Sequence, residues 1–71
     1  MNKSKDQLVS IVSNGGGIII DGSAYSTDQL AEISAASSGA KIIITNINSK
    51  STDQLCKIAD VSNGNVIFDL R

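Results

Sequence analysis

Apolar residues follow two alternating spacings along this chain, one typical of helices and one typical of strands. Three aliphatic runs, at residues 18–20, 42–44 and 66–68, begin at even intervals along the sequence. Short runs rich in β-branched residues and bounded by turn residues predict strands. Ahead of each run, apolar residues recur at intervals of three and four, which predicts a short amphipathic helix. The pattern therefore predicts a helix followed by a strand, three times over.

The three predicted helices begin with almost the same polar phrase. Ser-Thr-Asp-Gln-Leu occupies residues 26–30 and 51–55, and it recurs at residues 4–8 with lysine in place of threonine. A serine followed three residues later by glutamine predicts a capping box, and the aspartate in the first turn suits the helix dipole. Together with the strands, the phrase predicts three tandem units, at residues 4–21, 26–45 and 51–70, in a single domain of residues 1–71.

Alternation along the strands predicts a sheet that is covered on one face only. One face is wholly apolar and is expected to meet the helices: Ile18, Ile20, Ile42, Ile44, Val66, Phe68 and Leu70. The other face carries one row of isoleucines with polar residues on both sides, whereas a doubly covered parallel sheet is apolar on both faces. Strands joined through helices pair in parallel with right-handed crossovers. The predicted class is α/β, with three parallel strands in the order 1-2-3. An order of 2-1-3 stays open.

A short repeat that contains one helix and one strand is typical of a solenoid. In outline the chain resembles the leucine-rich-repeat class over most of its length. That family places a leucine three residues before the strand core, where this chain has Gly15 and Gly39. The family asparagine three residues after the core is replaced by Ser23 and Ile47. The resemblance therefore implies a solenoid-like arrangement of the helix–strand units and transfers no functional residue.

The composition indicates that the fold gains stability by association. The chain has 71 residues, and its apolar content of 41% includes one Phe, one Tyr and no Trp, so the core is made of small residues. Chains of this size often need a disulfide, a metal or a partner subunit. Cys56 is the sole cysteine and there is no histidine, so neither an internal disulfide nor a metal or other cofactor is expected. We therefore expect a homo-oligomer, with a dimer favoured.

Charge and hydropathy exclude two classes of partner. The net charge is −1 and the six basic residues are scattered, which argues against nucleic-acid binding. The aliphatic runs, each a triplet, are far too short to span a membrane. The start of the chain lacks the apolar stretch of a signal peptide, and a lone thiol suits a reducing compartment. These features predict a cytoplasmic protein.

The row of Ile19, Ile43 and Ile67 is the leading candidate for a functional surface, with Lys41 on the same face. A contiguous exposed apolar row often marks an interface, and the outer strands offer unpaired edges. The sequence therefore predicts a non-enzymatic interaction or assembly module that associates with itself through the open sheet face or a strand edge. Another protein is a possible partner.

An alternative site lies at the carboxyl ends of the strands, where ligands bind in open parallel sheets. Asp21, Thr45, Asn46 and Asp69 fall at that edge and supply oxygen ligands for a small polar molecule or a hard cation. Catalysis is not expected, because the chain has no histidine and the carboxylates of Asp21 and Asp69 have nothing to shift their pKa toward neutrality. The alternative function is a small-ligand or ion-binding domain.

Overall fold

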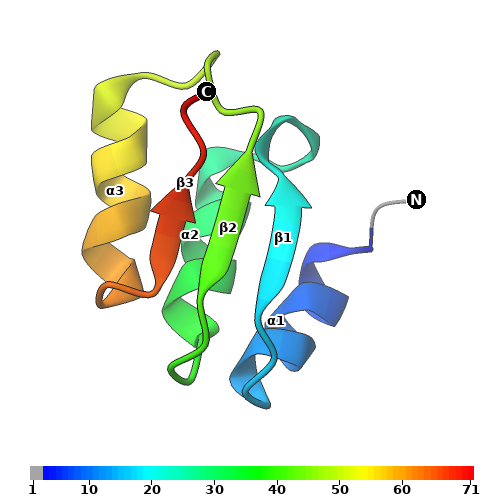
Figure 1. Ribbon diagram of the computed structural model, residues 1–71. Coiled ribbons are helices and arrows are strands. Elements are labelled where there is room, and N and C mark those ends of the chain that lie inside the picture. The colour runs from blue at the N-terminus through cyan, green and yellow to red at the C-terminus, as the bar shows by residue number, and fades with distance from the viewer. Residues whose placement is uncertain (1–2) are drawn as a thin grey trace.

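The computed structural model describes residues 3–71, in which three helices alternate with three strands. The strands form one parallel sheet in the order β1-β2-β3 (Figure 1). The predicted α/β class is confirmed, and of the two strand orders considered the sheet has 1-2-3. In chain order the elements are α1 (Lys5–Ser13), β1 (Ile18–Asp21), the short 3-10 helix η1 (Gly22–Ala24), α2 (Thr27–Ala36), β2 (Ile42–Thr45), α3 (Thr52–Ser62) and β3 (Val66–Phe68).

A complete capping box begins each of the three helices, as predicted. In each box the serine Oγ accepts a hydrogen bond from the main-chain N–H of the glutamine, and the glutamine Oε1 accepts one from the serine N–H. The pairs are Ser4 with Gln7, Ser26 with Gln29 and Ser51 with Gln54. These contacts satisfy main-chain donors that a helix start otherwise leaves unpaired. Within residues 3–71, no helix is long and apolar enough to cross a membrane.

The strands pair in a register that stays constant across the sheet. Ile18 lies opposite Ile42, and Ile42 lies opposite Val66. The same register places Asp21 beside Thr45. Residues that are equivalent in the three predicted units therefore lie side by side across the sheet.

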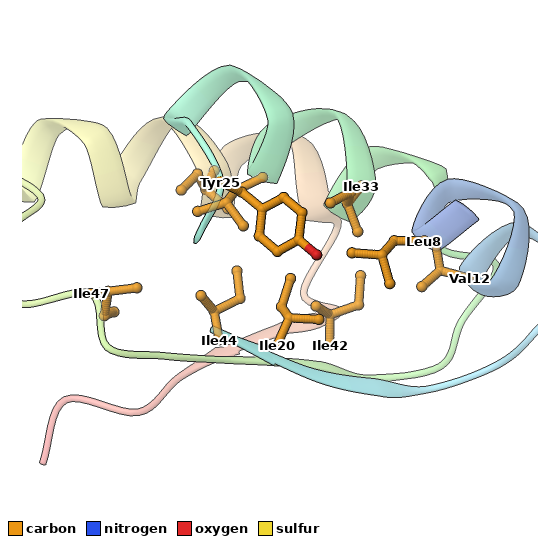
Figure 2. Packing of buried hydrophobic residues seen from close by; sticks show 10 residues of the cluster. Leu8, Val12, Ile20, Tyr25, Ile33, Ile42, Ile44 and Ile47 are labelled. Atoms are coloured by element: carbon orange, nitrogen blue, oxygen red, sulfur yellow. The ribbon is translucent and has the colours of Figure 1, made fainter. Parts of the chain in front are cut away.

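The core lies between the sheet and the helices, which cover one face (Figure 1). Figure 2 shows Ile20, Ile42 and Ile44 pointing from the strands toward the helix layer. Leu30 and Ile33 of α2 are fully buried there. The core cluster consists of Leu8, Val12, Ile20, Tyr25, Leu30, Ile33, Ile42, Ile44, Ile47 and Ile58. The strand alternation thus identified the covered face correctly.

Apolar residues at the two ends of the molecule are more exposed than the pattern predicts. Ile33 and Ile58 are fully buried, but the equivalent Ile11 of α1 is 36% exposed. The helices differ in position, since α2 and α3 each connect two neighbouring strands of the sheet, whereas α1 precedes β1, an edge strand. Leu70, expected on the covered face, is 64% exposed because β3 ends at Phe68. That assignment of Leu70 was wrong.

Cys56 shows the same end effect. Its alignment with Val9 and Ala31 predicts a packing role, and both of those residues pack against the core. Cys56 is exposed instead. It lies on α3, which packs against α2, and among residues 3–71 no further helix covers the side of α3 on which Cys56 lies.

Candidate interaction surfaces

The predicted row of isoleucines crosses the uncovered face of the sheet. Ile43 pairs in register with Ile19 on one side and with Ile67 on the other. Ile19 is 72% exposed and Ile67 is 46% exposed. Ile43 is half-buried between them. The structure therefore brings the three predicted residues together as one apolar strip, and their role as an interface stays a prediction.

Lys41 borders this strip at the amino ends of the strands. Its Nζ donates a hydrogen bond to the carbonyl oxygen of Gly64 at 2.8 Å, across to the turn that precedes β3. The side chain is therefore held beside the row by a contact to the main chain. Its charge forms part of a polar border to the apolar strip.

A shallow hollow extends the strip at the carboxyl end of β3. It has a volume of about 350 Å³, and Ile43, Ile67 and Leu70 supply apolar walls to it. The sequence pattern missed Leu70 as a surface residue because strict alternation assigned it to the covered face. The end of β3 at Phe68 is the physical reason, since alternation no longer fixes a side chain beyond the paired strand.

The predicted ligand residues are committed to local contacts at the strand ends. Asp21 Oδ1 accepts hydrogen bonds from the Ser23 Oγ at 2.6 Å and from the Ser23 N–H at 2.9 Å. These bonds, from the hydroxyl first and then the amide, lower the pKa of Asp21. Thr45, beside Asp21 in the sheet, donates its hydroxyl to the Ile20 carbonyl oxygen at 3.2 Å.

Asn46 and Asp69 also serve the turns in which they lie. Asn46 has a positive φ of 58°, so its backbone adopts the left-handed conformation. Apart from glycine, asparagine is among the residue types that adopt this conformation most readily. Asp69 Oδ1 accepts from the Arg71 N–H and from its Nε, each at 3.1 Å. The side-chain bond and then the backbone bond from Arg71 lower the pKa of Asp69. Within residues 3–71, no group of three or more His, Cys, Asp or Glu side chains could hold a metal ion.

The two sets of predicted residues share one side of the molecule. Residues 21 and 45 have the same parity as residues 19 and 43, so Asp21 and Thr45 continue the open face toward the strand ends. The open face is therefore apolar in the middle and polar at both ends. Comparison of the chain with protein-family models, with curated proteins and with solved structures finds no significant match.

Proposed function

We propose that this protein is a non-enzymatic assembly module that associates with copies of itself through the open face of its sheet or through a strand edge. The observation that carries the proposal is the in-register strip of Ile19, Ile43 and Ile67 on the uncovered face. Fully burying an aliphatic side chain of this size is worth roughly 1.5–3 kcal/mol. Association through this strip withdraws branched side chains from water that the monomer leaves exposed.

A twofold arrangement uses the strip most fully. In an isologous dimer the strip of one copy packs against the same strip of the other, so one surface supplies both sides of the contact. The polar residues at both ends of the face, among them Lys41 and Asp21, supply the polar rim that surrounds the apolar centre of an interface. A net charge of −1 puts little repulsion between two copies. The dimer is therefore the favoured assembly.

We also propose that the three helix–strand units are tandem repeats arranged as in a solenoid. Equivalent positions of the three units are paired across the sheet, as in a solenoid with one helix and one strand per turn. In a solenoid each unit is stabilised mainly by its neighbours, so the first and last units are the least supported. Association through the strip adds contacts that all three units share, since each unit contributes one isoleucine to it.

The substitution Ile43→Lys tests the sheet-face arrangement. Ile43 lies on the central strand, so a lysine there charges the middle of the strip and leaves both strand edges intact. We expect the wild-type dimer to persist over a hundredfold dilution and the variant to be a folded monomer at the same concentrations. Light scattering after size exclusion measures both masses.

The matched control is Ala35→Lys, which adds the same charge at an exposed position on α2. This control is expected to keep the wild-type mass. A dimer that survives Ile43→Lys would rule out the sheet-face arrangement. A wild-type monomer at every concentration would remove the proposal itself.

The alternative function, a small-ligand site at Asp21, Thr45, Asn46 and Asp69, has weaker support. The oxygens of Asp21 and Asp69 already accept hydrogen bonds from their own turns. A ligand has to replace these bonds or add to them. A rise in melting temperature with Mg²⁺ that is lost in Asp21→Asn would favour this alternative.

A further inference from the structure

Two turns of this protein have the same sequence but different hydrogen bonds. Ser-Asn-Gly occupies residues 13–15, at the end of α1, and residues 62–64, at the end of α3. Both turns lie at the end of the molecule where the strands begin (Figure 1). Asparagine is a chemically labile residue, and it is most labile before glycine, which has no side chain to obstruct attack by its main-chain nitrogen. The remaining asparagines precede residues that have a side chain.

Deamidation at an Asn–Gly step needs no enzyme. The main-chain nitrogen of the glycine attacks the side-chain carbonyl carbon of the asparagine, and a cyclic succinimide forms as the side-chain nitrogen leaves as ammonia with the proton of the glycine N–H. Water then opens the ring at either of its carbonyl groups. The products are aspartate and isoaspartate, in which the main chain runs through the former side chain. The net change replaces NH2 by OH, with water as the co-reactant.

The fold can hinder this reaction through hydrogen bonds at the turn. The reaction requires a free side-chain amide, a glycine N–H that can lose its proton, and a main chain that can rotate until the two groups meet. A hydrogen bond to any of these groups has to break first, which costs free energy. The bonds formed by each asparagine and by the glycine after it therefore indicate how readily each turn reacts.

The turn after α1 holds both reacting groups in hydrogen bonds. The Asn14 Nδ2 donates to the Ser10 carbonyl oxygen at 2.8 Å. The Asn14 N–H is shared between the carbonyl oxygens of Ser10 and Ile11, each at 3.3 Å. The Gly15 N–H donates to the Val12 carbonyl oxygen at 3.1 Å. This turn therefore opposes both the approach of the side-chain amide and the loss of the glycine proton.

The turn after α3 leaves the equivalent groups free. Within residues 3–71, neither the Asn63 side-chain amide nor the Gly64 N–H forms a hydrogen bond. Both residues are exposed. Asn63 also has a φ of 54°, in the left-handed region that is unfavourable for residues other than glycine. Rotation out of this conformation therefore meets little resistance from Asn63 itself.

The two turns also differ in how firmly they are attached to the rest of the fold. A main-chain bond spans the turn after α3, from the Asn65 N–H to the Ser62 carbonyl oxygen at 3.1 Å. The turn after α1 is joined in addition to the loop after α2, because the Ser38 N–H donates to the Val12 carbonyl oxygen at 3.2 Å. Exposed segments with few hydrogen bonds open locally at a low cost in free energy. The turn after α3 therefore reaches the reactive geometry more often.

Deamidation at residue 63 changes the start of β3 and the polar border of the open face. It adds a negative charge one residue before Gly64, whose carbonyl oxygen accepts from Lys41. Isoaspartate also lengthens the main chain just ahead of Asn65, whose carbonyl oxygen accepts from the Ile42 N–H at 2.8 Å. The modification therefore disturbs the first hydrogen bond between β2 and the β3 segment.

We infer that Asn63 is a site of spontaneous deamidation, whereas the fold protects Asn14 in the same tripeptide. The product accumulates with the age of the molecule and loosens the pairing of β3, the strand that carries Ile67. The inference goes beyond the proposed function and does not rest on it, because all the reacting groups belong to one chain.

The test follows the wild-type protein during incubation at mildly alkaline pH, with one sample folded and another unfolded in urea. Cleavage after lysine and arginine then places Asn14 in residues 6–41 and Asn63 in residues 58–71. Mass spectrometry detects the gain in mass as OH replaces NH2, and fragmentation of the second peptide separates Asn63 from Asn65. A sample digested without incubation corrects for deamidation during digestion.

In the folded protein we expect Asn63 to deamidate at least about tenfold faster than Asn14. A tenfold ratio corresponds to about 1.4 kcal/mol, which is the contribution of roughly one or two hydrogen bonds. In urea we expect similar rates at the two positions, because both turns are open and the flanking residues match.

Gly64→Ala is the control for the mechanism. It is compared with the wild type in urea, so that the strain of an alanine at a φ of 81° does not enter the result. The added Cβ obstructs the attacking nitrogen, so Asn63 is expected to deamidate more slowly in this variant while Asn14 keeps its rate.

Other results overturn the inference. Equal rates at the two asparagines of the folded protein, or a faster rate at Asn14, contradict the protection by hydrogen bonds. An unmodified Asn63 in the folded protein, at a time when the urea sample has deamidated, shows that the turn after α3 is protected as well. If Gly64→Ala does not slow the reaction, the carboxylate arises by direct hydrolysis, and the free Gly64 N–H is not the cause. The oligomeric state of the wild type decides none of these outcomes.

Discussion

Two buried serines in the helix layer differ in what their hydroxyl groups contact. Ser34 and Ser62 are 1% and 2% exposed. The Ser62 Oγ donates to the Ala59 carbonyl oxygen at 2.8 Å, whereas the Ser34 Oγ has no hydrogen-bond partner among the described residues. A buried hydroxyl without a partner costs roughly 1–3 kcal/mol of stability. The residue equivalent to Ser34 in α1 is Val12, so the position itself accepts an apolar side chain.

We predict that Ser34→Ala raises the free energy of unfolding by about 1 kcal/mol, because it removes a buried polar group that forms no bond. Ser62→Ala is the matched control and is expected to leave the free energy unchanged or to lower it, because it deletes a formed bond. Urea unfolding at low protein concentration measures both values. A loss of stability in Ser34→Ala would show that its hydroxyl has a partner.

Gly22 is required by space at the start of η1. A Cβ at this position meets the Ile47 Cγ2 at 2.5 Å, the Ile44 Cγ2 at 2.8 Å and the Thr45 carbonyl oxygen at 2.9 Å. We predict that Gly22→Ala lowers the free energy of unfolding by about 1–3 kcal/mol through overpacking. Gly39→Ala is the comparison, since a Cβ there meets nothing within 4 Å and only its positive φ is strained. An equal or smaller loss at Gly22 in urea unfolding would argue against the steric explanation.

Residues whose role depends on spacing were predictable, and those placed by tertiary contacts were not. The capping serines and glutamines follow from a fixed interval of three residues. Tyr25 and Ile47 are buried although both lie between regular elements, where periodicity carries no information. The Tyr25 hydroxyl also donates to the Lys3 carbonyl oxygen, a contact between residues 22 positions apart that no local pattern signals.

Ion pairs join neighbouring helices on the solvent side. Lys57 of α3 lies 2.7 Å from Asp28 of α2, and Lys5 of α1 lies 2.7 Å from Glu32 of α2. The hydrogen bond from Lys57, and then its charge, lower the pKa of Asp28. Each pair links two neighbouring helices at the surface. They are exposed, so salt screens them.

The lowered pKa of Asp28 leads to a prediction about acid stability. A carboxylate whose pKa is lower in the folded state stabilises the fold above its unfolded pKa of about 3.9, and this contribution disappears as the pH falls through the folded pKa. We therefore expect the melting temperature of the wild type to decrease as the pH drops below about 4. The melting temperature of Asp28→Asn is expected to decrease less over the same pH range. The control is Asp60→Asn, because the Asp60 carboxylate forms none of the ion pairs among residues 3–71. Its melting temperature is expected to decrease in acid as much as that of the wild type. Thermal melts from neutral to acid pH at low salt measure the effect, and an identical fall in both variants contradicts it.

Among the elements, the sequence pattern placed helix starts more reliably than strand ends. A helix start depends on side chains that bond within one turn, so the local sequence contains it. The end of β3 depends on pairing with β2, whose paired register stops at Ile44 and Phe68. Asp69 and Leu70 continue the apolar and polar alternation without continuing the strand, so the pattern alone overestimated its length.

At the scale of the whole molecule, the proposed association predicts that stability depends on protein concentration. Binding between folded copies stabilises the folded state by mass action. We expect the melting temperature of the wild type to rise as the protein is concentrated, and that of Ile43→Lys to rise less. Scanning calorimetry across a hundredfold range of concentration measures both slopes. Equal slopes, or a melting temperature independent of concentration, would contradict the role of the sheet face.

The overall architecture was predictable because one face of each strand is apolar along its whole length. That single property, carried by Ile42 and Ile44 on β2, placed the helices on one side of the sheet. The apolar hollow whose walls include Leu8, Ile11, Ile18 and Ile20 was not predictable, because no spacing in the sequence signals how closely α1 covers β1. Ile11 stands out as unusually exposed only when it is compared with Ile33 and Ile58, which occupy the equivalent positions of α2 and α3 and are buried.

Placing all three helices on one face of the sheet also gives the molecule a shape. Neighbouring strands lie about 4.8 Å apart and packed helices about 8–10 Å apart, so the helix layer is wider than the sheet beneath it. A chain of copies joined edge to edge therefore bends into an arc, with the isoleucine strip on its inner, concave surface. Two such arcs cannot lie flat against one another along their length. In the proposed association, contacts through strand edges and contacts through sheet faces would therefore compete, and the balance between them would set the length of an assembly.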